Sequence, residues 1–341
     1  MIDVAVVGAS GYIGGELLRL LLDHPEVRVA AAVSARLAGS RVDRVHPNLR
    51  GRTDLTFTDP DALGDHDVVF VAVAQTAGLE VVPRLRERAK VLIDLGADFR
   101  LRDPELYERY YGTAHTAPEQ LGSFVPGIPE MHRAELAGAD AISMPGCMAI
   151  ASILALRPLA EAGVVAGPVT VDGRIGSSGS GVRAEQMNLH AERSGTMRLF
   201  APAGHRHEAE IKQATGLEAR MSATGVEAVR GAQVVCRVPV REPLGDKEVR
   251  RLYRAHYQDE PFVRIIAQSR GLYRLPEPKI RSGTNYCDVG FATDPATSTV
   301  VAVAAVDNLV KGGAGGAVQS LNVRMGWPER LGLEFPGLHP V

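Results

Sequence analysis

The sequence predicts an α/β protein with a Rossmann-type, doubly wound parallel sheet followed by a second, α+β domain. Apolar runs of strand length alternate with helical patterns through residues 2–94, as is typical of parallel strands covered by helices on both faces. A glycine-rich stretch directly follows the first of these runs. The 341 residues are enough for two domains.

The predicted elements of the first domain follow in order along the chain. Residues 16–22 carry leucines at helical spacing and end at His24-Pro25, where proline stops a helix. A charged surface helix is expected over 83–89. Short apolar runs predict four parallel strands, at residues 2–7, 27–33, 67–73 and 91–94.

The pattern changes near residue 145. A strongly apolar helix is predicted for 148–156, and a further helix for 311–325. Strands of a second, mixed sheet are expected within 164–175 and at 232–240, 284–291 and 300–306. We therefore expect a nucleotide-binding domain over 1–145, a second domain over 146–310, and a C-terminal helix and tail over 311–341 that packs back on the first domain.

Composition excludes several classes of protein. The 38 basic and 40 acidic residues leave a net charge of −2, which argues against nucleic acid as a partner. No run of 18 uncharged apolar residues and no basic leader is present, so we expect neither a membrane span nor a signal peptide. Three cysteines are too few for a disulfide framework and favour a cytoplasmic location.

The glycine-rich stretch has the form expected of a dinucleotide-binding loop. It reads Gly8-Ala9-Ser10-Gly11-Tyr12-Ile13-Gly14, so its glycine spacing is G-x-x-G-x-x-G rather than G-x-G-x-x-G. The physical requirements are shared: a tight turn, close approach of backbone to a pyrophosphate, and a helix N-terminus directed at negative charge.

The end of the second strand favours NADP(H) as the cofactor. An enzyme that uses NAD tends to carry Asp or Glu there, for the ribose 2′-hydroxyl. This chain has Ser34-Ala35-Arg36 instead, and a hydroxyl with a guanidinium suits a 2′-phosphate. The alternative is that Arg36 is a solvated loop residue.

Cys147 is the candidate nucleophile. Pro145 and Gly146 precede it and an apolar helix follows, which places the thiol at a helix N-terminus, where the thiolate is favoured. Cys236 and Cys287 lie in strand-like runs and are expected to be buried core residues.

A thiolate beside a nicotinamide suits the interconversion of an activated acid and an aldehyde through a thioester, which needs an acid/base near the sulfur. The cluster Gly204-His205-Arg206-His207-Glu208 offers two histidines, and Arg206 could hold a substrate anion. The alternative is two surface histidines. Without a third ligand of matching spacing nearby, no metal site is predicted.

A second glycine/serine loop, residues 177–181, contains Ser178 and Gly179. It either supplies backbone N–H groups to an oxyanion or phosphate, which makes these two residues candidates for substrate binding, or forms a flexible turn. The residues alone leave both alternatives open.

Taken together and in order, the motifs resemble the N-acetyl-γ-glutamyl-phosphate reductases and their relatives, the carrier-protein-linked α-aminoadipate 6-phosphate reductases of lysine biosynthesis. The resemblance covers nearly the whole chain. Residues 46–53 and the segments 322–328 and 337–340 favour the lysine-type branch. The motifs are VGASGYIGGE, VSARLAG, DLGADFRL, PGC before a helix, GHRHEAEI, GTNYCDVGF and VDNLVKGGAGGAVQSLN.

The resemblance implies a fold like that of the semialdehyde dehydrogenases, NADPH as reductant, Cys147 as nucleophile, and a homo-oligomer (dimer or tetramer) formed by the second domain. It implies nucleotide contacts at residues 10–13 and 34–36 and at Asn308, and favours His205 over His207 as acid/base. Two departures stand out. Ala74-Gln75-Thr76 replaces the family's Pro-His-Gly, and Met148 replaces Tyr or Asn after the nucleophile; both positions are expected near the nicotinamide or substrate.

We therefore hypothesise an NADPH-dependent reductase that converts an acyl phosphate, held by an acidic amino-group carrier protein, to the semialdehyde. The acyl group is of the aminoadipate 6-phosphate or glutamate 5-phosphate type. Three alternatives stay open: a reductase of free N-acetylglutamyl phosphate, a catalytically silent NADP-binding sensor, and an aldehyde oxidoreductase that works in the oxidative direction.

Overall fold

In the computed structural model, which describes residues 1–182 and 184–341, the chain divides by its contacts into two units. The first unit contains Met1–Pro145 and Gly313–Glu334, and the second contains Gly146–Gly312 and Phe335–Val341. The C-terminal helix therefore belongs to the first unit, whereas the end of the chain belongs to the second.

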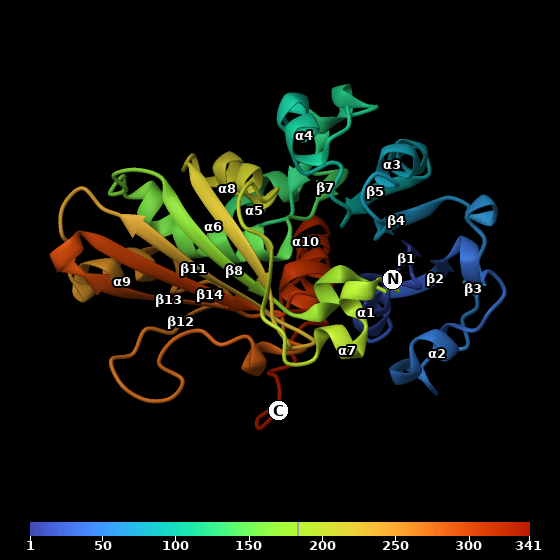
Figure 1. Ribbon diagram of the computed structural model, residues 1–341. Helices are drawn as coiled ribbons and strands as arrows, with labels where there is room; N and C mark the ends of the chain where they lie inside the picture. The colour runs from blue at the N-terminus through green and yellow to red at the C-terminus, as the bar shows by residue number, and fades with distance from the viewer. Residues whose placement is uncertain (183) are drawn as a thin grey trace. The chain divides into compact units, whose positions relative to one another are not determined.

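The first unit is built on a seven-stranded parallel sheet in the order β3-β2-β1-β4-β5-β7-β6 (Figure 1). From β1 the chain moves outward in one direction through β2 and then in the other through β4, so strand order reverses beside β1. The strands are β1 (Ile2–Val7), β2 (Val27–Val33), β3 (Phe57–Thr58), β4 (His66–Val71), β5 (Ala89–Asp94), β6 (Val125–Pro126) and β7 (Ala141–Ser143). This arrangement confirms the predicted Rossmann-type, doubly wound sheet.

Helices cover this sheet. Val82 and Leu85 of α3 pack on Val69, Val71 and Leu92 of the strands. The buried α10 packs against α1 and α5. The helices of the unit are α1 (Tyr12–Leu21), α2 (Val42–Val45), α3 (Gly78–Arg86), α4 (Pro104–Tyr111), α5 (Pro129–Leu136) and α10 (Gly315–Arg324).

The second unit contains a mixed seven-stranded sheet in the order β12-β13-β14-β11-β8-β10-β9. β8 and β10 run parallel, whereas β11 is antiparallel to both β8 and β14. Its strands are β8 (Val169–Ile175), β9 (Arg198–Ala201), β10 (Ala219–Gly225), β11 (Ala232–Pro239), β12 (Val263–Ile265), β13 (Cys287–Asp294) and β14 (Thr299–Val306). This mixed sheet confirms the expected second α+β domain.

One long helix, α6 (Cys147–Glu161), forms the centre of this unit. Most of its side chains are buried, as expected of a helix that is apolar nearly all round. It packs on β11 and β14 and against two further helices, α8 (His207–Thr215) and α9 (Asp246–Tyr257). A short helix, α7 (His190–Arg193), precedes β9.

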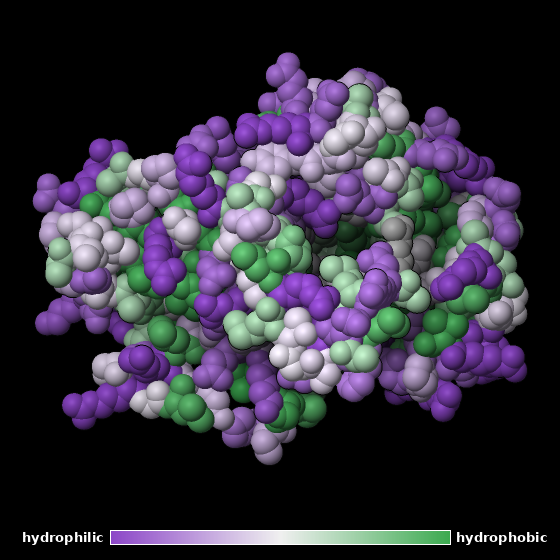
Figure 2. Space-filling view, viewed as in Figure 1, coloured by the Kyte–Doolittle hydropathy of each residue, from purple (hydrophilic) through white to green (hydrophobic). Residues whose placement is uncertain are grey.

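The surface is predominantly hydrophilic on the face that Figure 2 shows. On the face seen in Figure 2, hydrophilic side chains are interspersed with smaller hydrophobic patches. Among the described helices, none has the length and apolar character to cross a membrane.

Candidate active site and cofactor site

Cys147 is the first residue of α6, with Gly146 as the N-cap in an extended conformation. The N–H groups of a first helical turn have no acceptor within the helix and favour negative charge nearby. Cys147 is half-buried, whereas Cys236 in β11 and Cys287 in β13 are fully buried. Burial raises the pKa of Cys236 to about 12, and of the three cysteines only Cys147 is partly exposed.

The α8 helix brings a histidine and a carboxylate against the start of α6. The Gly146 N–H donates to Glu210 Oε2 at 2.8 Å, and Glu210 Oε1 lies 3.8 Å from His207 Nε2. A Cβ at position 146 would overlap the His207 ring, whose Cδ2 and Cε1 would lie only 2.7 Å away. Gly146 therefore allows His207 to lie directly against the backbone that leads into Cys147.

The two histidines of the cluster have different environments. Their ring centroids are 4.4 Å apart and the rings are nearly perpendicular, and the backbone N–H of His207 donates to His205 Nδ1 at 3.2 Å. Burial and the neighbouring Arg206 lower the pKa of His205 to about 4, so this ring is neutral near pH 7. His207 is buried, and the Glu210 carboxylate lies beside it.

The loop after β14 also approaches the nucleophile. A Cβ on Gly312 would lie 2.6 Å from Cys147 Cβ, so only glycine allows this approach. Gly312 lies in a π-helical turn, Val310–Ala314, and such turns are frequent at functional sites.

The second glycine/serine loop is tied into the fold. Ser178 and Asn308 bind each other, with Asn308 Nδ2 donating to Ser178 Oγ at 3.0 Å, and the Gly231 N–H donates to Asn308 Oδ1 at 2.7 Å. The N–H groups of Ser178 and Gly179 donate to the carbonyls of Val229 and Gly176. These bonds engage the N–H groups of Ser178 and Gly179 and commit the Asn308 side chain within the second unit.

In the first unit, the glycine-rich loop has the geometry of a phosphate cradle. Gly8 has φ of 80°, and a Cβ there would lie 2.7 Å from the Ala72 carbonyl carbon, so only glycine fits. The N–H groups of Gly8 and Ala9 donate to Val33 O. The Ser10 N–H has no acceptor in the described part of the chain, and it stands just before α1, so it is available to a pyrophosphate.

The predicted 2′-phosphate residues lie next to this loop. Ser34 Oγ is 2.9 Å from Ser10 Oγ, which joins the ends of β1 and β2. Ala35 and Arg36 lie in a short 3-10 helix, Ala35–Leu37, and Arg36 is exposed. Tyr12 and Ile13 begin α1.

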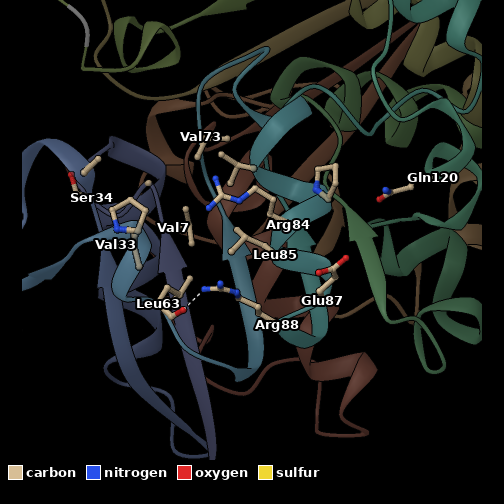
Figure 3. A pocket seen from close by; sticks show the side chains of 15 residues that line it. Val7, Val33, Ser34, Leu63, Val73, Arg84, Leu85, Glu87, Arg88 and Gln120 are labelled. Atoms are coloured by element: carbon tan, nitrogen blue, oxygen red, sulfur yellow. Dashed lines mark hydrogen bonds between the residues drawn. The ribbon is translucent and has the colours of Figure 1, made fainter.

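A cavity of about 570 Å³ opens beside Ser34 and Ala35. Its walls are mainly apolar, and its residues come from the ends of β1, β2 and β4, the segment around Pro60, and α3. In Figure 3, Arg84 extends from α3 into the space opposite Val33, whereas Arg88 turns to the Leu63 carbonyl, at 2.6 Å. An apolar slot with a hydroxyl and a guanidinium at its rim suits an adenosine group, so the residues present fit a dinucleotide.

The two departures from the family pattern have different structural outcomes. Met148 is buried, and its Sδ would lie 2.8 Å from a Cβ on Gly173 of β8, so it fills core space. Thr76 has φ of 68°, a conformation that favours glycine. Its N–H donates to Asp98 Oδ1 at 3.0 Å, which holds the loop in this form.

Several residues that lie at these sites are not among those that the sequence predicts. Glu210 had a usable signal, because it follows His207 by three residues on a helix and thus shares its face. No local sequence signal indicates that Gly312 and Arg84 belong to these sites, because their place there depends on chain segments far away in the sequence. Within residues 1–182 and 184–341, no group of three His, Cys, Asp or Glu residues is placed to hold a metal ion.

A sheet with a dinucleotide loop, followed by a unit with a cysteine at a helix N-terminus, defines the class of NAD(P)-dependent oxidoreductases that act on aldehydes or activated acids. Comparison with known proteins specifies the family. Residues 3–139 match the model of the semialdehyde dehydrogenase NAD binding domain, and residues 147–308 match that of the semialdehyde dehydrogenase dimerisation domain.

Full-length relatives agree. The chain is 46% identical to the LysW-L-2-aminoadipate 6-phosphate reductase of Deinococcus radiodurans, over 99% of this chain and 98% of that protein. It is 47% identical, over the whole of both chains, to a Thermomicrobium roseum protein that carries the same name provisionally. The chain therefore belongs to the semialdehyde dehydrogenase family.

Solved structures share the fold at low identity. Aspartate semialdehyde dehydrogenase II of Vibrio cholerae has a TM-score of 0.73 at 16% identity, covering 96% of this chain and 98% of that one. The Candida albicans aspartate semialdehyde dehydrogenase, solved with NADP, has a TM-score of 0.71 at 15% identity, with 95% and 98% covered.

Proposed function

We propose that this chain reduces an acyl phosphate, presented on an amino-group carrier protein, to the semialdehyde with NADPH as the reductant. The observation that carries the proposal is the meeting of a half-buried thiol at the start of α6 with the His207–Glu210 pair of α8. The names of the relatives, which specify LysW-L-2-aminoadipate and LysW-L-glutamate phosphates, support the carrier-bound substrate.

The proposed reaction begins with attack of the Cys147 thiolate on the acyl carbon. A carbon–sulfur bond forms, the bond between the acyl carbon and the bridging oxygen of the phosphate group breaks, and inorganic phosphate leaves. The N–H groups at the start of α6 favour the thiolate and the oxyanion that develops on the acyl oxygen. When bound, the reduced nicotinamide supplies the hydride that the thioester carbon needs.

An imidazolium then provides a proton to the oxygen of the thiohemiacetal anion. When the carbon–sulfur bond breaks, the aldehyde is released, the thiolate is restored, and the imidazole takes back the hydroxyl proton. We assign this acid/base role to His207 ahead of His205, because the His207 ring lies directly against the backbone that leads into Cys147 and has Glu210 beside it. A pKa of about 4 leaves His205 uncharged at neutral pH. This assignment reverses the order that the family resemblance implies.

Single substitutions distinguish the roles of the two histidines. His207→Asn is expected to lower kcat by at least about 10²-fold, the scale of general acid–base catalysis, whereas His205→Asn is expected to lower it less. The reverse order of kcat losses would return the role to His205.

We propose NADPH rather than NADH on the basis of Ser34 and Arg36, next to the cavity that suits adenosine. Arg36→Ala is expected to weaken NADPH binding and to leave NADH binding unchanged, because only NADPH carries the 2′-phosphate. Arg44→Ala is the control: Arg44 is also exposed in the first unit, but Arg36 directly follows Ala35, which lines the cavity, whereas neither chain neighbour of Arg44 lines it. Equal affinities of the Arg36 variant and the wild type for NADPH would show that Arg36 does not bind the 2′-phosphate.

The carrier is tested with two substrates. Carrier-bound aminoadipate 6-phosphate or glutamate 5-phosphate is expected to oxidise NADPH, with one phosphate released per NADPH. Turnover of only free N-acetylglutamyl phosphate would assign the chain to the other branch of the resemblance, and binding of NADPH without turnover of either substrate would favour the sensor alternative.

We also propose that the chain forms a homo-oligomer through the second unit. The matching model for residues 147–308 is named a dimerisation domain, and β8 alternates buried residues with exposed ones such as Thr170 and Arg174, which leaves one face of its sheet open. Light scattering on the purified protein is expected to give a multiple of the 36.4 kDa chain mass; a mass of one chain would overturn this proposal.

A further inference from the structure

The segment that begins at His46 has no role in the proposed chemistry, yet its first side chain lies against the dinucleotide loop. His46 ends α2, and its N–H donates to Val42 O at 2.9 Å. Its ring Nε2 is 2.8 Å from the Ala9 carbonyl oxygen, so Nε2–H donates to the loop. The Phe57 ring packs edge-on against it, with the centroids 6.5 Å apart.

The start of α1 has a space that fits this ring. A Cβ on Gly15 would lie 2.5 Å from His46 Nδ1 and 3.0 Å from Nε2. Any larger residue at position 15 would therefore push the imidazole away from Ala9. The loop, the helix and His46 interlock at this point, although more than thirty residues separate them in the chain.

The bond to Ala9 sets the direction of a group that faces the cofactor. The Ala9 carbonyl and the Ser10 N–H belong to the same planar, trans peptide unit, so they point in opposite directions. A carbonyl bound to His46 on one side turns the Ser10 N–H to the other. That N–H is the one that has no acceptor in the described part of the chain.

We propose that His46 is a positioning residue for the dinucleotide: by holding the Ala9 carbonyl, it keeps the Ser10 N–H directed at the pyrophosphate. This inference rests on the proposed use of NADPH and adds a residue that does not itself touch the cofactor. Without the bond to His46, the peptide unit between Ala9 and Ser10 can rotate, and fixing it when NADPH binds then costs free energy.

The test measures the affinity of the full-length protein for two ligands. His46→Ala is expected to bind NADPH about 3- to 10-fold more weakly, which is the range of one hydrogen bond, and to keep kcat at saturating NADPH. Affinity for 2′-AMP, which has no pyrophosphate, should be unchanged. His46→Gln retains an N–H donor and is expected to restore part of the loss.

His66→Ala is the matched control, because His66 belongs to the same unit and also bonds a carbonyl, Gly64 O at 3.0 Å, away from the loop. Gly15→Ala should weaken NADPH binding in the wild type but add nothing in the His46→Ala background. Unchanged NADPH affinity of His46→Ala, or an equal loss for 2′-AMP, would overturn the inference. Failure of the wild type to bind NADPH would instead overturn the proposed function.

Discussion

A methyl group added at Gly146 tests whether His207 must lie against the start of α6. Gly146 has φ of −65° and ψ of 151°, which alanine adopts without strain, so Gly146→Ala changes only the space available. The added Cβ would lie 2.7 Å from two ring carbons of His207, and ordinary contact begins at 3.4 Å. His207 Nε2 would lie closer still, so the ring must withdraw by more than about 0.7 Å.

A displacement of this size is large on the scale of catalysis. A misplacement of about 1 Å can cost 10²-fold in rate, so we expect kcat to fall by about that factor. The dissociation constant for NADPH should be unchanged, because the dinucleotide loop lies in the other unit. Single-turnover release of phosphate and NADPH oxidation, measured on the same sample, give the rate, and isothermal titration gives the affinity.

Gly138→Ala is the control, since a Cβ at position 138 meets nothing within 4 Å. In a His207→Ala background the Gly146 substitution should have no further effect on kcat, because the ring that it displaces is gone. Wild-type kcat in Gly146→Ala, with a normal melting temperature, would refute the role given to His207.

Three further predictions concern stability and reactivity. Thr76→Gly should raise the free energy of unfolding by about 0.5–1 kcal/mol, because relief of a left-handed conformation (about 1–2 kcal/mol) exceeds the entropy cost of glycine; a lower melting temperature would contradict this. Burial raises the pKa of Asp94 to about 7, so the stability that its protonated form contributes is complete below about pH 4 and is lost as pH rises through 7. The free energy of unfolding of Asp94→Asn, relative to that of the wild type, should then grow by up to about 1.4 kcal/mol per pH unit between about pH 4 and 7 in chemical denaturation. A constant difference between the two proteins over this range would contradict the raised pKa. Iodoacetamide at neutral pH should label Cys147 in the native protein and spare the buried Cys236 and Cys287, as peptide mass mapping would reveal.

The sequence was sufficient for the parts of the fold that local pattern determines. The strands with continuous apolar runs, the dinucleotide loop and the long apolar helix after Cys147 all form where they were expected. The helix predicted for 83–89 was placed wrongly, because α3 spans Gly78–Arg86 with Pro83 inside. Packing of Val82 and Leu85 on the sheet outweighs the preference of proline for a helix start.

The site was predictable only in part, for a physical reason. Cys147 and the two histidines carry recognisable chemistry in short motifs. The contacts that organise them depend on tertiary structure: Glu210 reaches Gly146 across 64 residues, and His46 reaches Ala9 across 37. A single sequence contains no pattern that predicts such pairings. The need for glycine at Gly146 and Gly15, where a Cβ would overlap a histidine ring, was therefore not predictable.

Covalent catalysis by Cys147 is tested by comparing the wild type with the Cys147→Ser variant on carrier-bound aminoadipate 6-phosphate. The wild type should oxidise NADPH and release phosphate in equal amounts, with an acyl group trapped on Cys147 when NADPH is left out. The variant should bind NADPH with wild-type affinity and do neither. An acyl group trapped on a residue other than Cys147, or turnover by the serine variant at the wild-type rate, would show that Cys147 is not the nucleophile.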